Sequence, residues 1–447
     1  MYFESGGVKQ SQPEDLRYEK EVHMAVGVGV IGAGTVGGGV IETLQGNAGV
    51  IRDKTGLDVV LRHVADLNTD ALAQYNLDGV TVSGDAIALI NDPEVQVVCE
   101  LIGGVTVAKK FILAALEAGK HVVTANKMLL AHHGPELAEA AARNNVWLRY
   151  EAAVAGTIPI IKGVRESLAA NHIHGVYGVL NGTCNYILTR MQEEELEFGD
   201  ALAQAIEAGF AETPPDLDIE GHDTAHKCQI LASLCFNTQV KLEDIYVEGI
   251  TKLTQLDVTY ADELGYDIKL LAIARRTEGE IEVRVHPTLV PQDHLLASAR
   301  REFNAVFVQS DLADDTFYQG RGAGKMPTAS AVVGDIVDIA TNPGNPRPAF
   351  TYNHSLEVRA IGLLRGRYYL RLTTKDHPGV LGQICTTLGK HGVSIASCFQ
   401  HEESEDTPAH VVIMSHYALE SAVMQAVSEI DAQDFIAEPT HLLRVLA

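Results

Sequence analysis

Three glycines at fixed spacing, Gly32, Gly34 and Gly37, constrain the fold of this 447-residue chain more than any other feature. They follow an apolar run at 25–31, which is typical of a parallel strand covered on both faces, and they precede a helical pattern at 36–44. In such a turn the first glycine permits a tight bend, the second lets a ligand approach the backbone, and the third lets helix and strand pack closely. Strand, turn and helix in this order predict a doubly wound α/β domain.

The same turn predicts a dinucleotide site, because free N–H groups and the helix dipole at the start of a helix favour a pyrophosphate. The chain carries 34 basic and 59 acidic residues, a net charge of −25, so an anionic ligand needs such a local positive site. Asp66, at the end of a second predicted strand, would accept a hydrogen bond from a ribose 2′-hydroxyl and repel a 2′-phosphate. This favours NAD, while Arg52, Lys54 and Arg62 leave NADP open if the fold brings them close.

Strand and helix patterns alternate up to about residue 150. The expected strands lie at 59–65, 95–102 and 121–124, with a helix at 108–118. Strands that alternate with helices imply right-handed crossovers and a parallel sheet, so we expect a Rossmann-type domain over 24–150.

Two further domains are expected. Residues 151–340 mix helical and strand-like patterns and predict an α+β domain, whose last helix, expected to begin near Pro327, can return to the first domain. A proline-rich stretch opens a linker at 341–366. Residues 367–447 then show a βαββαβ order, which is ferredoxin-like.

Composition limits the partners and the compartment. Apolar residues make up 46% and charged residues 21%, and no apolar run reaches the roughly 18 residues of a membrane span. An acidic chain repels nucleic acid and anionic membranes, so we expect neither as a partner. The six cysteines show no C-x-x-C spacing, which predicts free thiols in a reducing cytoplasm. Residues 1–23 lack the apolar core of a secretory signal and are expected to be a disordered arm or an added extension.

Two segments of the middle region carry candidate chemistry. Lys127 follows a predicted strand, where the carboxyl ends of parallel strands line a ligand crevice. The segment 209–227 is rich in carboxylates, and Asp223 and Lys227 share one helix face at i,i+4 spacing. The pair is either an exposed ion pair of little energetic weight or part of a cradle for an amine, with Lys227 as acid and base.

One pattern in this segment is misleading. His222 and His226 have the spacing of a zinc-hydrolase helix, but Asp replaces the usual Glu and no third ligand is placed, so a metal hydrolase is not favoured. Further along, the glycine-rich loop 320–324 before a predicted helix is either a second backbone approach to the cofactor or a simple connection.

Together these segments resemble homoserine dehydrogenase, and the resemblance covers nearly the whole chain from about residue 24. The motifs that carry it are the glycine turn, Glu100–Gly104, Thr124–Lys127, Glu151–Gly156, Leu180–Tyr186, 212–227 and Gly322–Gly324. The segment Lys375–Leu381 resembles the opening loop of an ACT regulatory domain.

The resemblance implies interconversion of L-homoserine and L-aspartate 4-semialdehyde with NAD or NADP. It implies that Lys227 donates the proton, that Lys127 lies between cofactor and substrate, and that the middle domain is the catalytic and dimerisation domain. The implied substrate-binding carboxylates are Glu212, Asp218 and Asp223. The implied cofactor contacts, with the turn glycines and Asp66, are Thr35, Val36, Gly103, Ala125, Lys127, Gly209 and Gly324.

By the same resemblance a structural sodium ion would be held by Glu151, Val154, Gly156 and Ile158. The ACT domain would bind an effector, with threonine as the natural hypothesis, near Asp376, Gly379, Val380 and Leu381. A homodimer or homotetramer is expected. Two alternatives stay open: a non-catalytic sensor that binds a nucleotide and an amino acid, and a dehydrogenase of another amino acid.

Overall fold

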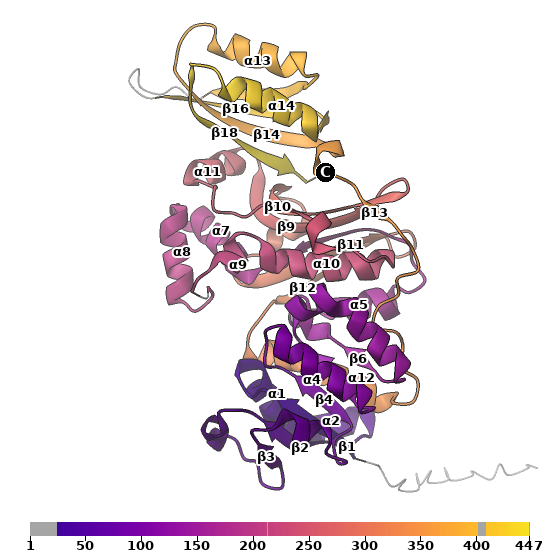
Figure 1. Cartoon of the computed structure of the whole chain (residues 1–447). Coiled ribbons are helices and arrows are strands. Elements are labelled where there is room, and N and C mark those ends of the chain that lie inside the picture. The colour runs from indigo at the N-terminus through magenta and orange to yellow at the C-terminus, as the bar shows by residue number, and fades with distance from the viewer. Residues whose placement is uncertain (1–24, 212, 401–407, 447) are drawn as a thin grey trace, which may run out of the picture.

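The computed structural model describes residues 25–211, 213–400 and 408–446, and its three domains follow one another along one long axis (Figure 1). The N-terminal domain lies at one end and the C-terminal domain at the other. The expected arm 1–23 and the candidate residue Glu212 lie outside the described residues.

The N-terminal domain is built on a six-stranded parallel sheet with strand order β3-β2-β1-β4-β5-β6. Its strands are β1 (Val26–Ile31), β2 (Val59–Ala65), β3 (Thr81–Ser83), β4 (Val97–Glu100), β5 (His121–Thr124) and β6 (Leu148–Arg149). Its helices are α1 (Thr35–Gly46), α2 (Ala48–Thr55), α3 (Ala86–Ile90), α4 (Thr106–Glu117) and α5 (Lys127–Arg143). The strand order reverses between β1 and β4, which is where such sheets open a ligand crevice.

Helix α12 (Lys325–Thr341) returns to this first domain from the far end of the middle domain. Its fully buried Val332, Ile336 and Ile339 join the same apolar core as Val28 and Val30 of β1. The helix begins two residues before the expected Pro327, directly after the glycine-rich loop.

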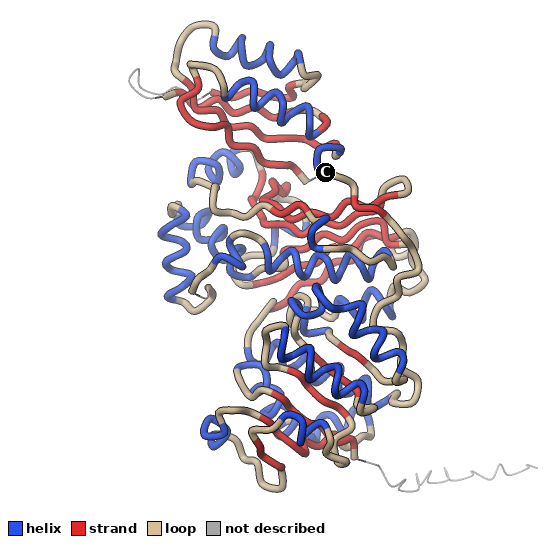
Figure 2. The backbone as a smooth tube through the Cα atoms, viewed as in Figure 1, coloured by secondary structure: helices blue, strands red, loops and turns tan. Residues whose placement is uncertain are grey.

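The middle and C-terminal domains share one mixed sheet, with strand order β12-β11-β7-β9-β10-β18-β14-β16-β15 (Figure 2). The strands are β7 (Ile173–Val179), β9 (Tyr266–Arg276), β10 (Glu280–Pro291), β11 (Phe303–Ser310), β12 (Asp315–Arg321), β14 (Arg365–Thr374), β15 (Ile395–Gln400), β16 (Ala409–Ser415) and β18 (Ile436–Val445), with short β8 (Tyr246–Val247), β13 (Glu357–Val358) and β17 (Ala418–Leu419) beside them. The middle-domain helices are α6 (Ile160–Lys162), α7 (Gly182–Glu194), α8 (Phe198–Glu207), α9 (Asp216–Ile219), α10 (His222–Phe236) and α11 (Gln255–Glu263).

The C-terminal unit has the expected βαββαβ order, with α13 (Val380–Lys390) and α14 (Glu420–Asp431) on one face of its sheet (Figure 1). The α/β, α+β and ferredoxin-like classes are thus confirmed. The junction was not expected: β18 pairs in parallel with β10, through Thr288 with Arg444 and Leu289 with Val445. The segment 341–366 also packs on the middle domain, because β13 pairs with β10 and His354 bridges Thr238.

Two other expectations concern thiols and membranes. The cysteines are free, as expected: Cys99, Cys184, Cys228 and Cys235 are buried, Cys385 is half-buried and Cys398 is exposed. Over the described ranges, no helix is both long and apolar enough to cross a bilayer.

Candidate active site

The centre of the site is the start of α10, a helix buried on almost every side. Gly221 precedes it with a φ of +84°, a left-handed conformation that favours glycine. One helical turn then aligns Asp223 with Lys227, which are 7% and 8% exposed. Lys227 Nζ lies 2.6 Å from Asp223 Oδ2 and donates to the Leu180 carbonyl oxygen at 2.7 Å. The exposed surface pair is therefore excluded, because both charges are buried.

A second ammonium group reaches the same carboxylate from the N-terminal domain. Lys127 is the first residue of α5, three positions after the end of β5, and its Nζ lies 2.9 Å from Asp223 Oδ1. Asp223 thus bridges two lysines from two domains. Because the carboxyl ends of parallel strands lie at one edge of a sheet, Lys127 is on the same edge as the glycine turn.

The polar surroundings of this triad include residues that the sequence alone did not single out. Asn181 Nδ2 donates to Asp218 Oδ1 at 2.7 Å and to Asp223 Oδ2 at 2.9 Å, while its Oδ1 caps α7. Thr183 donates to Asp218 Oδ2 at 3.1 Å, and Asn304 donates to the Leu180 carbonyl at 3.0 Å. Asn181 and Thr183 lie within a motif that carried the resemblance, which was the available signal.

Burial and charge act in opposite directions on the ionisable groups. Burial lowers the pKa of Lys227 and Lys127 lowers it further, while Asp223 opposes both. Burial alone would raise the pKa of Asp223, but the two lysines hold it well below its usual range. Burial raises the pKa of Asp218, although Asn181 opposes the shift. A carboxylate that stays ionised next to a destabilised ammonium suits proton transfer by Lys227.

The glycine turn has the shape expected of a cofactor cradle. A Cβ on Gly37 would collide with the Gly32 carbonyl oxygen, so helix and strand pack as closely as predicted. A Cβ on Gly34 would meet no atom within 4 Å, so this backbone faces open space. Gly34 also precedes α1 without a side-chain cap. Free N–H groups beside open space fit a pyrophosphate.

Asp66 is held by the turn itself. Its Oδ2 accepts the Ala33 N–H at 2.6 Å, and its Oδ1 accepts the Asn68 N–H at 2.8 Å. Glu100 ties the neighbouring strand ends together, because its carboxylate accepts from Thr124 Oγ1 at 2.8 Å and from the Ile102 N–H at 2.9 Å. Of the three cations considered for a 2′-phosphate, Arg52 is paired with Asp58 at 2.5 Å.

The remaining cofactor candidates lie in loops and at helix starts. Gly103, Gly209 and Gly324 all have positive φ values, of 74°, 75° and 120°, and all are exposed. Thr35 and Val36 open α1, and Ala125 lies between β5 and α5. Thr35 and Val36 thus adjoin the turn, and Ala125 follows β5 at the edge of the sheet that carries it.

The expected sodium residues form a sharp loop after β6. Both Glu151 carboxylate oxygens accept backbone N–H groups, from Ile161 and Lys162, each at 2.8 Å. Ala155 and Gly156 both adopt left-handed backbone conformations, with φ values of 57° and 58°. Across the described residues no group of three or more His, Cys, Asp or Glu side chains could hold a metal ion, so any cation here would depend on carbonyl oxygens.

The zinc-hydrolase pattern does not form a metal site. His222 is exposed at the first position of α10, whereas His226 is buried and lies beside the His132 ring, at 5.6 Å between centroids. Burial lowers the pKa of His226 to about 4. No described acidic or sulfur side chain joins them as a third ligand.

A dinucleotide cradle beside a lysine–carboxylate–lysine bridge, whose Asp223 and Lys227 are buried, defines an NAD(P)-dependent oxidoreductase. Comparisons with known proteins agree. A family model described as "Homoserine dehydrogenase, NAD binding domain" matches residues 32–151, the "Homoserine dehydrogenase" model matches 159–337, and the "ACT domain" model matches 368–416. The chain belongs to the homoserine dehydrogenase family.

Relatives match over nearly the full length. The homoserine dehydrogenase of Neisseria gonorrhoeae is 43% identical, covering 94% of this chain and 98% of the relative, and that of Pseudomonas aeruginosa is 42% identical with the same coverage. The crystal structure of a homoserine dehydrogenase from Thiobacillus denitrificans matches with a TM-score of 0.89 at 40% identity, covering 95% of this chain and 99% of that one. The comparisons therefore favour the dehydrogenase over the non-catalytic sensor.

Proposed function

We propose that the chain interconverts L-homoserine and L-aspartate 4-semialdehyde, with Lys227 as proton donor in reduction and proton acceptor in oxidation. The observation that carries the proposal is the Asp223 carboxylate, which fixes Lys227 and Lys127 on its two oxygens at the sheet edge of the glycine turn. The nicotinamide, when bound, supplies the hydride chemistry. The protein has to orient the substrate and move one proton.

One N–H donor of the Lys227 ammonium group remains available to the substrate. An ammonium group has three N–H donors, and two of them go to Asp223 and to the Leu180 carbonyl. The third is available to the oxygen of the substrate that gains or loses a proton. Asp218, Asp223 and Glu212 are the proposed carboxylates that bind the substrate amine or orient Lys227, and Asn181 positions the first two.

The direction of the Lys227 pKa shift predicts opposite pH profiles for the two reactions. Oxidation needs the neutral amine, whose fraction grows as pH rises, and burial brings its pKa below the ordinary value of about 10.4. Homoserine oxidation should therefore accelerate from about pH 7 to about pH 10, and semialdehyde reduction should slow over the same range. Initial rates at saturating substrate test this, and an oxidation rate independent of pH would contradict the assignment.

Gly34 and Gly37 provide a matched pair for the cofactor site. Gly34→Ala fills the open space in front of the turn and should weaken cofactor binding about tenfold or more, with an unchanged urea midpoint. Gly37→Ala forces helix and strand apart and should also lower stability by about 1–3 kcal/mol. Fluorescence titration with the reduced nicotinamide and urea denaturation separate the two effects. If Gly34→Ala bound the cofactor with wild-type affinity, the assignment of the pyrophosphate to this turn would be contradicted.

The remaining assignments complete the proposal. The residues that would contact the cofactor are Gly32, Gly34, Thr35, Val36, Gly37, Asp66, Gly103, Ala125, Lys127, Gly209 and Gly324. Of these, Asp66 favours NAD.

Carbonyl oxygens around Glu151, Val154, Gly156 and Ile158 would hold sodium, since hard oxygen ligands suit it. The edge strands β12 and β15 have backbone N–H and C=O groups that could pair with another copy of the chain in a homodimer or homotetramer. Free cysteine thiols support a cytoplasmic location.

Threonine is the proposed effector of the ACT domain, at the loop between β14 and α13. Asp376 and Gly379 are exposed there, and Gly379 has a φ of +95° before α13. Val380 anchors the helix in the core, while Leu381 is 39% exposed. This leaves a polar loop and one apolar side chain at the surface for a ligand or a second copy.

The deciding experiment for the function is a cofactor-swapped assay. Homoserine, and separately other amino acids, are incubated with NAD or NADP while the absorbance of the reduced nicotinamide is followed. Turnover of homoserine well above that of the other amino acids supports the proposal, and the faster cofactor settles the preference. Absence of turnover with both cofactors would support the sensor, and preference for another amino acid would support another dehydrogenase.

A further inference from the structure

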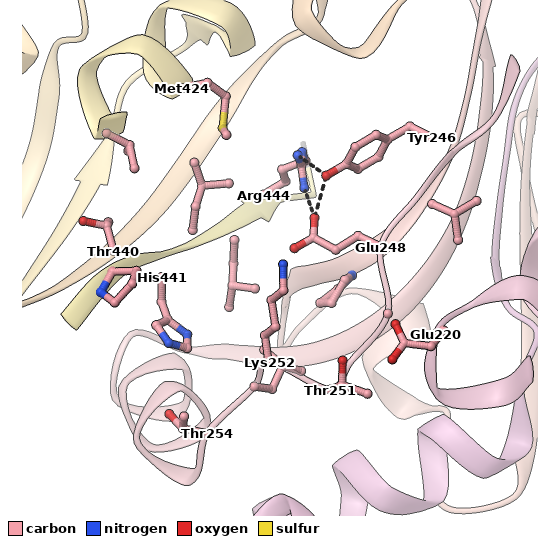
Figure 3. A pocket seen from close by; sticks show the side chains of 18 of the residues that line it. Glu220, Tyr246, Glu248, Thr251, Lys252, Thr254, Met424, Thr440, His441 and Arg444 are labelled. Carbon is pink, nitrogen blue, oxygen red and sulfur yellow. Dashed lines mark hydrogen bonds and ion pairs between the residues drawn. The ribbon is translucent and has the colours of Figure 1, made fainter. Parts of the chain in front are cut away.

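A cavity of about 790 Å³ lies between the C-terminal domain and the middle domain, and neither Lys127, Asp223 nor Lys227 lines it (Figure 3). One wall comes from α14 and β18, and the other comes from β8, the segment 248–254 and the turn between α9 and α10. Its volume is within the range of about 300–1,000 Å³ that is usual for small-molecule sites. None of its lining residues belongs to the effector loop at 376–381.

The cavity presents charges of both signs. Lys252 is exposed, and its side chain extends into the cavity, where its amine points toward Glu248 and Arg444 (Figure 3). Glu248 accepts both of its hydrogen bonds on Oε2, from Tyr246 and from Arg444, each at 2.9 Å. None of the described residues donates a hydrogen bond to Oε1. Glu220 lines the same cavity.

These charges select a class of ligand. Two other basic residues of the lining, Arg444 and His441, are already paired with Glu420 and Asp257. The carboxylates of Glu220 and Glu248 would repel a phosphate, and the Lys252 amine would be poorly solvated against a purely apolar ligand. A zwitterion satisfies both, with its carboxylate on Lys252 and its ammonium on the free oxygen of Glu248. Met424 and Val427 of α14 supply apolar surface for a side chain.

The cavity wall is connected to the catalytic residues through packed backbone. Ile250 N–H donates to the Ile219 carbonyl oxygen at 2.8 Å, and a Cβ on Gly249 would collide with that same carbonyl. Ile219 follows Asp218 and lies four residues before Asp223. A shift of the 248–250 segment would therefore displace the turn at 220–221, which joins Asp218 of α9 to Asp223 of α10.

The opposite wall is tied to this segment by Arg444 of β18. Its guanidinium forms a two-point hydrogen-bonded pair with Glu420, with Nη2–Oε1 at 2.6 Å and Nε–Oε2 at 3.1 Å, and it also donates to Glu248. A ligand beside Glu248 competes for the carboxylate that joins the two domains. Ligand binding at Glu248 would thus displace the 248–250 segment and, through it, the turn before α10.

We propose that this cavity binds a small free α-amino acid and that its occupancy adjusts the turn between α9 and α10. The site is separate from the effector loop at Asp376. The inference goes beyond the proposed reaction, because binding is measured without turnover. It therefore stands or fails independently of the activity assay.

The test is calorimetric titration of the full chain with L-threonine, L-valine and L-methionine. Lys252→Met should weaken binding of at least one of them tenfold or more. The matched control is Lys241→Met, which removes a surface lysine that is paired with Glu243 at 3.5 Å and lies outside the cavity. Asp376→Asn tests the effector loop in parallel, and far-ultraviolet circular dichroism verifies that each variant is folded.

Ligand analogues assign the two charges. The amide of the best amino acid lacks the carboxylate, so it should bind wild type and Lys252→Met equally, whereas the N-acetyl form should bind neither well. The proposal is overturned if no amino acid binds, if Lys252→Met titrates like wild type, or if Asp376→Asn alone abolishes binding. It is also overturned if Lys252→Met weakens the amide as much as the free amino acid.

Discussion

Lys227→Met should lower kcat for homoserine oxidation by about 10²- to 10⁴-fold, the usual contribution of a positioned acid or base. The substitution keeps most of the buried side-chain volume and removes only the amine. Asp223 retains two partners, Lys127 at 2.9 Å and Asn181 at 2.9 Å, so the site does not acquire an uncompensated charge. Folding and the cofactor cradle should therefore survive the change.

Two measurements make this result interpretable. Fluorescence titration with the reduced nicotinamide should give a wild-type dissociation constant for Lys227→Met, because the glycine turn lies in another domain. Lys241→Met, a change at a 62%-exposed side chain, should leave kcat unaltered. Near-wild-type turnover in Lys227→Met would refute the role of the lysine.

Asp257→Asn should reduce the free energy of unfolding at pH 7 by about 3–5 kcal/mol, the usual cost of removing one partner of a buried ion pair. Asp257 of α11 is fully buried and pairs with Arg371 of β14, through Oδ1–Nε at 2.6 Å and Oδ2–Nη2 at 3.0 Å. His441 Nδ1 lies 3.2 Å from the same carboxylate. The amide would leave the Arg371 guanidinium buried without its counter-charge at the junction of two domains.

The effect has a defined pH dependence. Burial would raise the pKa of Asp257, but the hydrogen bonds from His441 and Arg371 hold it well below its usual range. A depressed carboxyl pKa contributes stability above the unfolded value of about 3.9 and loses it as pH falls toward the folded value. The difference between wild type and Asp257→Asn should therefore shrink in acid, below about pH 4.

Urea denaturation of both proteins, at pH 7 and in acid, measures this difference. Asp262→Asn on the same helix is the matched control, because Asp262 is exposed and accepts a neutral hydrogen bond from Gln292 at 2.9 Å. Its effect should stay below about 1 kcal/mol. Equal midpoints for Asp257→Asn and Asp262→Asn would show that the buried pair does not hold the C-terminal domain in place.

Local patterns predicted most of the elements, because they depend on neighbours in the chain. The glycine turn, the strand that ends at Ala65 and the βαββαβ order follow from period and turn chemistry, and the structure confirms them. The Asp223–Lys227 spacing predicted a shared helix face but could not show its burial. Whether a face is buried depends on segments far away in sequence, here Leu180 and Lys127.

The features that the sequence did not predict depend on contacts between residues that are far apart in the chain. The parallel pairing of β18 with β10 joins residues more than 150 positions apart, and an apolar strand does not show which edge it will extend. Asn304 was missed as a site residue because a lone amide has no periodicity or spacing that marks it, and Asn181 was quoted only as part of the 180–186 motif, without a role of its own. The cavity beside Lys252 likewise exists only once the C-terminal domain is docked.

The most direct test of the account is the position of the Lys227 amine in a crystal structure of the protein with the oxidised nicotinamide cofactor and L-homoserine. Lys227 Nζ should lie within about 2.7–3.2 Å of the homoserine hydroxyl oxygen, as a hydrogen bond requires. An amine that is out of hydrogen-bonding reach of that oxygen, with homoserine seated against the nicotinamide, would contradict the proposed mechanism.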